Sequence, residues 1–496
     1  MAFEARSAGS QDPCGPLPWP AARGVTLGAA VVLPVPLSLV ISDKTGRLLY
    51  ARLAKDHVGL RLPSVTAGLV RGGTLVWTGG CGGVDGTVPG PDVQYRCGSI
   101  TKTFVAVAVL RLRDAGQVDL SDPIGRHIEA GAAAELTVGQ LMSHTSGVRA
   151  ETAGPWWERT PGVPLQALID GSLGQDGRRL RPGRMHHYSN VGYALLGQLV
   201  AGLSGTSWDA LVAAELLAPL GMTRTTTRPQ QPHATGFAVH PHADLVLREP
   251  EHDALAMAPA GQLWTTVADL ARWAGFLAAA PGCGDGLLSA STLAEMREPA
   301  AILDVPGEPW AAGYGLGLQL WNDGGRRSYG HIGSMPGFFA QLRINAATGD
   351  AAIAMTNSTA GFGAALTGDL LDLFAEHEPA DPPAAPKAGA PPAHAMDLTG
   401  TWYWGPAPFL ASLTGEELEF RTPGPRTRTF RFRQRGDAVW TGIDDYFAGE
   451  PITPVRDADG EIIALDIASH LYTRAPYDPR APIPGGVDPE GWQPAR

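Results

Sequence analysis

Two largely apolar stretches, each interrupted by a turn signal, predict β-hairpins that lie far apart in the chain. The first, "VTAGLVRGGTLVWTGG" over residues 65–80, reads as two strands around Arg71-Gly72-Gly73. The second, "FFAQLRINAATGDAAIAMTN" over residues 338–357, reads as two strands that turn near Thr348-Gly349-Asp350. Strands at both ends of a region with helices between them predict one sheet built from N- and C-terminal pieces, with helices packed on it.

Helical spacing of apolar residues dominates the region between these hairpins. It predicts helices within "SITKTFVAVAVLRLRDAG" (99–116), "SWDALVAAELLAPLG" (207–221) and "TTVADLARWAGFLAAA" (265–280). Thr266 and Asp269 have the spacing of a capping box at the start of the last helix.

A Pro/Ala-rich stretch, "PADPPAAPKAGAPPA", has no apolar periodicity and predicts an extended linker over residues 379–394. Behind it come short alternating runs such as "LEFRT" and "TFRFRQ" and the turn signal Asp459-Gly460, which predict a small all-β barrel or sandwich, lipocalin-like in size. The predicted organisation is a leader segment (1–42), a catalytic domain (43–378), the linker, and an all-β C-terminal domain (395–496).

Composition narrows the choice of partners and compartment. The 496 residues carry a net charge of −11 without a run of basic residues, so neither nucleic acid nor membrane insertion is expected. The apolar run at residues 25–41 is broken by Pro34 and Pro36 and lacks the basic start of a signal peptide, so we expect a cytoplasmic protein. The 4 cysteines form neither a zinc pattern nor a disulfide framework, and no metal or cofactor is expected.

Ser99 and Lys102 open the helix predicted over residues 99–116, in "CGSITKTF". Residues i and i+3 share a helix face, and a helix N-terminus offers unpaired N–H groups. A partly desolvated lysine loses proton affinity and can serve a nucleophilic serine as base. Alternatively, Ser99 is an N-cap and Lys102 is solvated, which this pair alone does not exclude.

Two further short motifs offer partners for such a serine. In "MHHYSNVG", Tyr188 lies beside an ammonium group that would favour its phenolate, and Asn190 could bind a substrate amide or fix the lysine. In "YGHIGSMPG", Gly333 allows close backbone approach of a ligand along a strand edge, and the N–H of Ser334 could be an oxyanion donor beside that of Ser99. The alternatives are a turn before a helix and, for His331, a partly exposed strand residue.

SxxK, YxN and HxG in this order resemble the penicillin-recognising serine hydrolase family, which includes class C β-lactamases, low-molecular-mass penicillin-binding proteins, D-aminopeptidases and esterases. "LMSHTSGV" (141–148), "PLGMTRT" (219–225), "AGQLWTTVADLARW" (260–273) and "YGLGLQL" (314–320) support the resemblance. It implies an α+β, β-lactamase/transpeptidase-like domain: an antiparallel sheet flanked by helices, a helical subdomain, and a site between them.

The resemblance also implies a role for each residue of the three motifs. Ser99 would be the acylated nucleophile, Lys102 its proton partner and Tyr188 the general base and acid. The remaining four would bind substrate: Asn190 at its amide, His331 and Gly333 along the docking strand, and Ser334 at the oxyanion. Trp156 and Trp157 could wall an acyl pocket or anchor a loop on the core.

His331 departs from the lysine that β-lactamases and D,D-peptidases of this family usually carry there. A histidine is mostly neutral near pH 7, so a substrate carboxylate should be held less well. We therefore expect a serine hydrolase that acts through an acyl-enzyme on an ester or amide, as an esterase or D-amino-acid peptidase, with weak β-lactamase activity at most. The substrate would be a small molecule or peptide. The alternatives are an acyltransferase or peptide cyclase with the same machinery and a ligand sensor without turnover.

Overall fold

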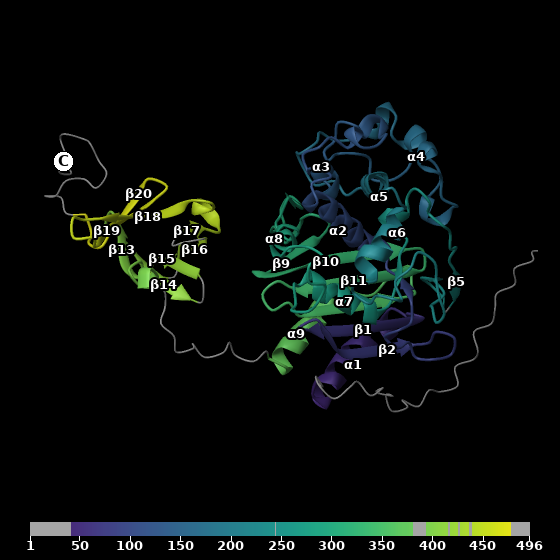
Figure 1. Cartoon of the computed structure of the whole chain (residues 1–496). Coiled ribbons are helices and arrows are strands. Elements are labelled where there is room, and N and C mark those ends of the chain that lie inside the picture. The colour runs from purple at the N-terminus through teal and green to yellow at the C-terminus, as the bar shows by residue number, and fades with distance from the viewer. Residues whose placement is uncertain are drawn as a thin grey trace, which may run out of the picture. The chain divides into compact units, whose positions relative to one another are not determined.

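The computed structural model describes residues 41–379 except 244, and residues 393–477 except 415–416, 425–426 and 436–438. The chain divides into two compact units, Met1–Ala380 and Asp381–Arg496 (Figure 1). The predicted leader and linker fall almost entirely outside the described residues, and the domain boundaries given above stay predictions. Among the described residues no helix combines the length and apolar character needed to cross a membrane.

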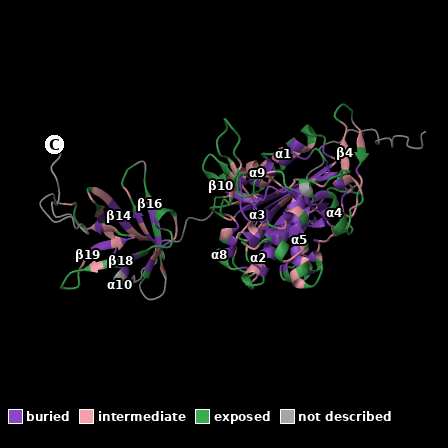
Figure 2. Ribbon diagram, turned by 90° about the horizontal axis from the view of Figure 1, so that it is seen from above, coloured by how far each residue is buried: buried purple, intermediate pink, exposed green. Residues whose placement is uncertain are grey.

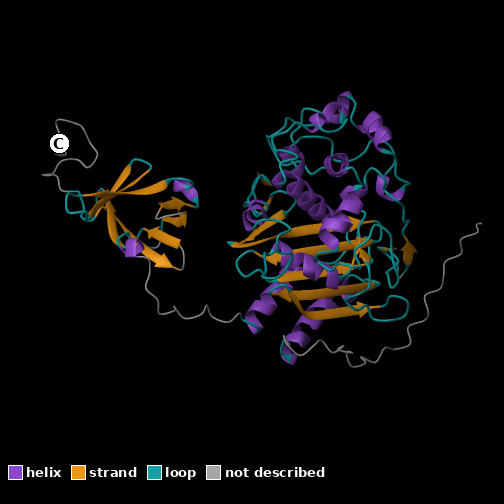
Figure 3. Cartoon of the chain, viewed as in Figure 1, coloured by secondary structure: helices purple, strands orange, loops and turns teal. Residues whose placement is uncertain are grey.

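An eight-stranded antiparallel sheet forms the centre of the first unit (Figure 3). Its strands in spatial order are β2 (Thr74–Gly82), β1 (Ser64–Arg71), β12 (Ala351–Thr356), β11 (Phe338–Asn345), β10 (Arg326–Met335), β9 (Gln319–Asp323), β8 (Ala312–Tyr314) and β7 (Ala301–Ile302). Both predicted hairpins are present, as β1–β2 and β11–β12. Val65 pairs with Thr356, so N- and C-terminal pieces join in one sheet, which confirms the predicted assembly.

Both faces of this sheet are buried, and alternate residues of β12 belong to the cores on the two faces. Ala352 and Ala354 pack into the core beneath α1 (Asp43–Gly59) and α9 (Leu366–His377). The alternate positions Ile353 and Met355 belong to the larger core on the other face, where α7 (Val267–Leu277) lies. Side chains alternate across a strand, so a continuous apolar run is what a sheet covered on both faces requires.

The remaining helices gather in a helical subdomain above the sheet, at the top of the unit in Figure 1. They include α2 (Thr101–Asp114), α3 (Val138–Met142), α4 (Leu165–Ser172), α5 (Asn190–Ser204) and α6 (Trp208–Val212), with α8 (Ala290–Glu295) beside β9. Helix α2 packs on α5 and α6, and most residues of α2 and α5 are buried (Figure 2). Two small sheets complete the unit: β3 (Tyr95–Arg96) with β6 (Trp264–Thr265), and β4 (Phe237–Val239) with β5 (Val246–Arg248).

The three predicted helices are found, with two local differences. The helix expected over residues 207–221 ends at Val212 and continues as a π-turn, Ala213–Leu217, before Pro219, which has no N–H to extend the ladder. At α7 only half of the predicted capping box forms, because the carboxylate of Asp269 accepts hydrogen bonds from the Arg224 N–H and the Thr225 hydroxyl instead.

The second unit contains a closed eight-stranded antiparallel barrel, which confirms the predicted all-β class. A short helix, α10 (Ala393–Met396), precedes strands β13 (Gly400–Trp404), β14 (Ala407–Thr414), β15 (Glu417–Arg421), β16 (Thr429–Arg435), β17 (Val439–Gly442), β18 (Pro451–Arg456), β19 (Ile462–Ile467) and β20 (His470–Thr473). Alternate residues such as Leu418 and Phe420 fill the interior, and pairing of Tyr403 with Thr473 closes the barrel.

Candidate active site

Ser99 lies in a single 3₁₀ turn, Gly98–Ile100, that leads directly into α2. Its side chain caps neither this turn nor α2, so the alternative of an N-cap serine is excluded. The half-buried Ser99 hydroxyl instead accepts a hydrogen bond from Lys102 Nζ at 2.9 Å. The i, i+3 spacing therefore brings the two predicted groups into direct contact.

Lys102 is fully buried, which excludes the alternative of a solvated lysine. Besides Ser99, its Nζ donates to Asn190 Oδ1 at 2.6 Å and to the Ala260 carbonyl at 2.7 Å. Burial lowers the pKa of Lys102 to about 7, against the opposing effect of the Glu151 and Glu158 carboxylates. The amine is thus poised to exchange a proton near neutral pH.

Tyr188 immediately precedes α5, and its ring centroid lies 5.0 Å from Lys102 Nζ. The sequence argument that the ammonium favours the phenolate is wrong in direction. Burial raises the pKa of Tyr188, and the hydrogen bond with Ser99 only partly offsets this effect. Desolvation is the largest effect, and the negative charges of Glu151 and Glu158 add to it. Tyr188 is therefore a neutral phenol beside the serine.

Asn190, the first residue of α5, connects Lys102 to an acidic loop. Its Oδ1 accepts from the lysine, and its Nδ2 donates to Glu151 Oε1 at 2.6 Å. The other Glu151 oxygen accepts from Trp157 Nε1 at 2.7 Å. Of the two roles considered for Asn190, fixing the lysine is observed, and contact with a substrate amide stays a prediction. Trp157 is a buried loop anchor.

The backbone of β10 abuts the turn that carries Ser99. A Cβ atom on Gly333 would lie 1.9 Å from the Cys97 carbonyl oxygen and 2.8 Å from the Ser99 nitrogen. A Cβ on Gly98, which has φ +53°, would lie 2.5 Å from the Ser334 nitrogen. The glycines thus permit a close approach, but the partner is this chain's own turn, and the approach of a ligand along the strand stays a prediction. The N–H groups of Ser99 and Ser334 come from these adjoining segments.

His331 is fully buried on β10, so the alternative of a partly exposed strand residue is wrong. Its Nδ1 lies 2.5 Å from the Ile332 carbonyl, which can only accept, so this nitrogen carries the proton. Nε2 then accepts from the Tyr314 hydroxyl at 2.9 Å. Burial, reinforced by nearby Lys102, lowers the pKa of His331 to about 3. The imidazole is neutral at physiological pH, as expected.

Sequence reasoning missed four side chains of this region: Glu151, Glu158, His144 and Tyr314. Glu158 is half-buried beside Trp156, whose Nε1 donates to it at 2.8 Å, and burial raises the pKa of Glu158. Trp156 itself is exposed. The motif "SHTSG" was a signal for His144, but no spacing rule linked it to Tyr188. The two glutamates belong to an irregular loop without a recognisable pattern.

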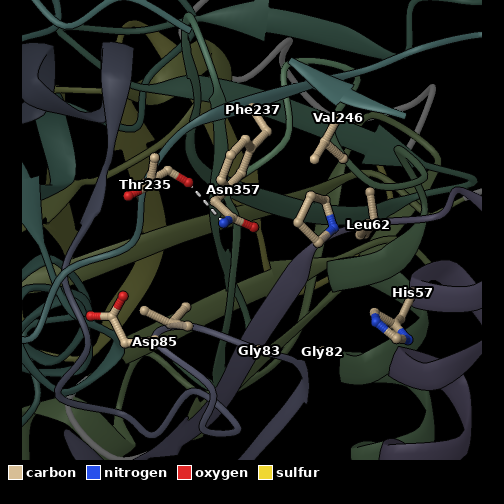
Figure 4. A pocket seen from close by; sticks show the side chains of 11 residues that line it. His57, Leu62, Gly82, Gly83, Asp85, Thr235, Phe237, Val246 and Asn357 are labelled. Atoms are coloured by element: carbon tan, nitrogen blue, oxygen red, sulfur yellow. Dashed lines mark hydrogen bonds between the residues drawn. The ribbon is translucent and has the colours of Figure 1, made fainter. Parts of the chain in front are cut away.

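A cavity of about 480 Å³ opens where β1 begins and β2 ends (Figure 4). His57, Leu62, Asp85, Phe237 and Val246 line it with Asn357, whose Nδ2 donates to the Thr235 carbonyl at 2.8 Å. None of the predicted site residues lines this cavity. In the described ranges, including this cavity, no group of three or more His, Cys, Asp or Glu side chains could hold a metal ion.

Comparison with known proteins places this arrangement in a family. Residues 50–376 match the family model described as Beta-lactamase, which spans more than half of the chain. The chain belongs to the β-lactamase family. It is accordingly a serine hydrolase of the β-lactamase-related type. Residues 391–474, which include the barrel, match a separate model described as Domain of unknown function (DUF7586).

Individual relatives of this β-lactamase-family chain agree with that placement. Penicillin-binding protein 4 of Amycolatopsis lactamdurans is 30% identical over 339 residues, which cover 63% of this chain and 84% of that protein. A D-amino acid amidase from Ochrobactrum anthropi SV3, solved with L-phenylalanine amide, is 26% identical, with a TM-score of 0.57 over 68% of this chain and 98% of the amidase.

A third relative shares the fold over more of the chain. The octameric penicillin-binding protein homologue from Pyrococcus abyssi has a TM-score of 0.60 and covers 87% of this chain and 100% of its own. At 19% identity this likeness concerns the fold alone.

Proposed function

We propose that the chain hydrolyses an ester or amide through a covalent acyl-enzyme on Ser99. The observation that carries this proposal is the contact between the Ser99 hydroxyl and a fully buried amine, Lys102 Nζ, at 2.9 Å. A serine becomes nucleophilic when an adjacent base accepts its proton. Lys102 suits that task because its pKa of about 7 lets it be neutral at working pH and still accept a proton during attack.

Proton transfer is then divided between two residues. As Ser99 Oγ bonds to the substrate carbonyl carbon, its proton passes to Lys102 Nζ. When the bond to the leaving group breaks, Tyr188, which burial keeps protonated, gives its phenolic proton to the departing nitrogen or oxygen. The Lys102 ammonium restores that proton to Tyr188, and water attack on the acyl-enzyme repeats the sequence in reverse.

The developing oxyanion needs donors at the same point. The N–H groups of Ser99 and Ser334 belong to segments so close that a Cβ on Gly98 or Gly333 would overlap the opposite backbone. Two preorganised backbone donors of this kind stabilise a tetrahedral intermediate by about 3 kcal/mol each. This proximity supports the oxyanion role predicted from the sequence.

The charges around the site favour a substrate with an amino group over one with a carboxylate. His331 is neutral where a lysine would hold a carboxylate, and Glu151 and Glu158 lie close enough to Lys102 to raise its pKa. Two carboxylates repel a substrate anion and attract an ammonium group. Together with the likeness to a D-amino acid amidase, this supports D-amino-acid amides and esters with a free α-amino group as the substrate class.

A substrate panel tests this function. D-Phenylalanine amide, its L-enantiomer, N-acetyl-D-phenylalanine amide and benzylpenicillin would be compared with wild-type enzyme and the Ser99→Ala variant. We expect Ser99-dependent turnover of the free D-amide, with kcat/KM at least about tenfold lower after N-acetylation removes the ammonium charge. Equal or better use of the N-acetylated amide would overturn the substrate class, and turnover independent of Ser99 would overturn the mechanism.

A further inference from the structure

His144 contacts Tyr188, the acid of the proposed reaction, and the residues on either side of it. The His144 carbonyl accepts the N–H of His187 at 2.7 Å, and its Nδ1 accepts the N–H of Ser189 at 3.1 Å. These are the residues before and after Tyr188. One fully buried histidine therefore holds the backbone on both sides of the tyrosine.

The imidazole also packs directly on the phenol ring. The centroids of the His144 and Tyr188 rings lie 4.2 Å apart with an interplanar angle of 38°. On the other sides His144 meets Tyr314 at 4.5 Å and Tyr193 at 5.1 Å between ring centroids. The Tyr188 ring is thus held by a neighbour that is itself enclosed by aromatic rings, which fixes its orientation.

The contacts of His144 require a neutral ring. Because Nδ1 accepts from Ser189, the single proton lies on Nε2, which is buried without a hydrogen-bond partner. A charged imidazolium would carry a proton on Nδ1 and lose this bond. Burial, the Lys102 charge, and the neighbouring His186, His331 and His187 keep the pKa of His144 well below its usual value. His144 therefore holds its contacts throughout the working pH range.

The backbone at His144 is in the left-handed region, with φ +57°. This conformation costs a residue with a Cβ roughly 1 kcal/mol, and such positions persist where the surrounding structure fixes them. Gly, Asn, Asp and His are the residues that adopt it most often. The backbone at this position is therefore one that Gly and Asn variants can also adopt.

We propose that His144 is a positioning residue that holds the Tyr188 hydroxyl in line between Ser99 and the leaving group. The inference rests on the proposed function and goes beyond it, because His144 would act through Tyr188. Its loss should leave the nucleophile intact and impair the step that needs a proton from Tyr188. That step is the departure of an amine, whereas p-nitrophenolate leaves without protonation.

Two variants with matched backbones separate positioning from general damage. His144→Gly and His144→Asn both tolerate positive φ, and Asn alone restores an acceptor near the place of Nδ1. We expect kcat for D-phenylalanine amide to fall about 100-fold in His144→Gly and to recover only to about tenfold below wild type in His144→Asn. Acylation by D-phenylalanine p-nitrophenyl ester should change less than about threefold in both variants.

The size of the p-nitrophenolate burst counts folded, competent sites, so each rate is normalised to it. Equal losses with amide and ester in both variants would mean a structural role and overturn the proposal, as would an unchanged amide rate in His144→Gly. If His144→Gly does not fold, the amide-to-ester ratio in His144→Asn decides alone: a ratio lowered from wild type supports positioning, and an unchanged ratio refutes it.

A double-mutant cycle with Tyr188→Phe tests whether the two residues act as one unit. His144→Gly should add no further loss of amide turnover in the Tyr188→Phe background, because there is no phenolic proton left to position. Additive losses would contradict the proposal. Failure of the wild-type enzyme to acylate at all would instead refute the proposed function, so the two failures are distinguishable.

Discussion

The interiors of the two units are built on different principles. Around Ser99 the first unit fully buries Lys102, His144 and His331, each held by hydrogen bonds and surrounded by tyrosine rings. In the barrel, every buried side chain among the described residues is apolar or aromatic, as at Trp402 and Phe432.

This difference agrees with the proposed location of the reaction. Burying an ionisable group costs several kcal/mol unless it is neutral or well paired, and clusters of such groups often mark functional sites. The first unit meets that cost by lowering the pKa values of Lys102 and His331 and by placing Lys102 Nζ among three oxygen partners. Among the described residues of the barrel, the buried ionisable group is Tyr472, a phenol that burial keeps neutral by raising its pKa.

The largest expected effect in the first unit comes from removing the nucleophile. Ser99→Ala should lower kcat for D-amino-acid amides by about 10⁴-fold or more, because a covalent route is lost while substrate binding remains. Steady-state kinetics on purified protein measures this, and Ser121→Ala, on an exposed loop, is the matched control. Retention of more than a few per cent of kcat in Ser99→Ala would show that the reaction does not use this hydroxyl.

The second challenge removes the buried base. Lys102→Met keeps an apolar stem of similar length but cannot accept a proton, so kcat should fall about 1,000-fold. The control for the loss of one positive charge is Lys55→Met, at a site on α1 away from Ser99. Its kcat/KM is compared with that of Lys102→Met. A Lys102→Met enzyme within tenfold of wild type would place the base elsewhere.

The barrel offers the converse experiment. Phe432→Ala removes a fully buried ring and should lower the unfolding free energy of the barrel by about 3–5 kcal/mol. Because no chemistry is expected there, kcat for the amide should be unchanged at temperatures where the barrel remains folded. Thermal unfolding followed by near-ultraviolet circular dichroism, with amide kinetics on the same samples, measures both. A parallel fall in kcat would show that the barrel contributes to the reaction.

The smallest expected effect concerns pH. Protonated Lys102 cannot accept a proton, so kcat/KM should rise as pH increases through about 7 and be lost below it. The negative charge of Glu151 raises the pKa of Lys102, so Glu151→Gln should move this limb to lower pH. Glu129→Gln, at an exposed position, is the control. A limb that stays in place or moves upward in Glu151→Gln would contradict the electrostatic account.

The sequence allowed prediction of what depends on local spacing or on whole motifs. Ser99 and Lys102 meet because i and i+3 share a helix face, and the alternation in β15 matches the observed barrel. The predictions that failed concern how deeply a side chain is buried in the folded chain. The direction of the Tyr188 pKa was wrong, and the exposure of His331 was left open, because burial results from segments far apart in the chain.

The contributions of Glu151 and His144 could not be predicted for a related reason. Glu151 lies on an irregular loop, and only the folded chain brings it to Asn190 and Trp157. His144 acts on the backbone around Tyr188, a contact that leaves no periodic trace in the sequence. Both join segments that neither motif spacing nor hydrophobic pattern connects.

The most direct measurement is to trap the acyl-enzyme and locate it. The full-length protein would be mixed with D-phenylalanine p-nitrophenyl ester, quenched in acid within milliseconds to seconds, and digested for mass spectrometry. The account predicts one phenylalanyl group per chain, attached to the peptide that contains Ser99 and absent from Ser99→Ala. Ester turnover with no adduct at any quench time, or an adduct on another side chain, would contradict it.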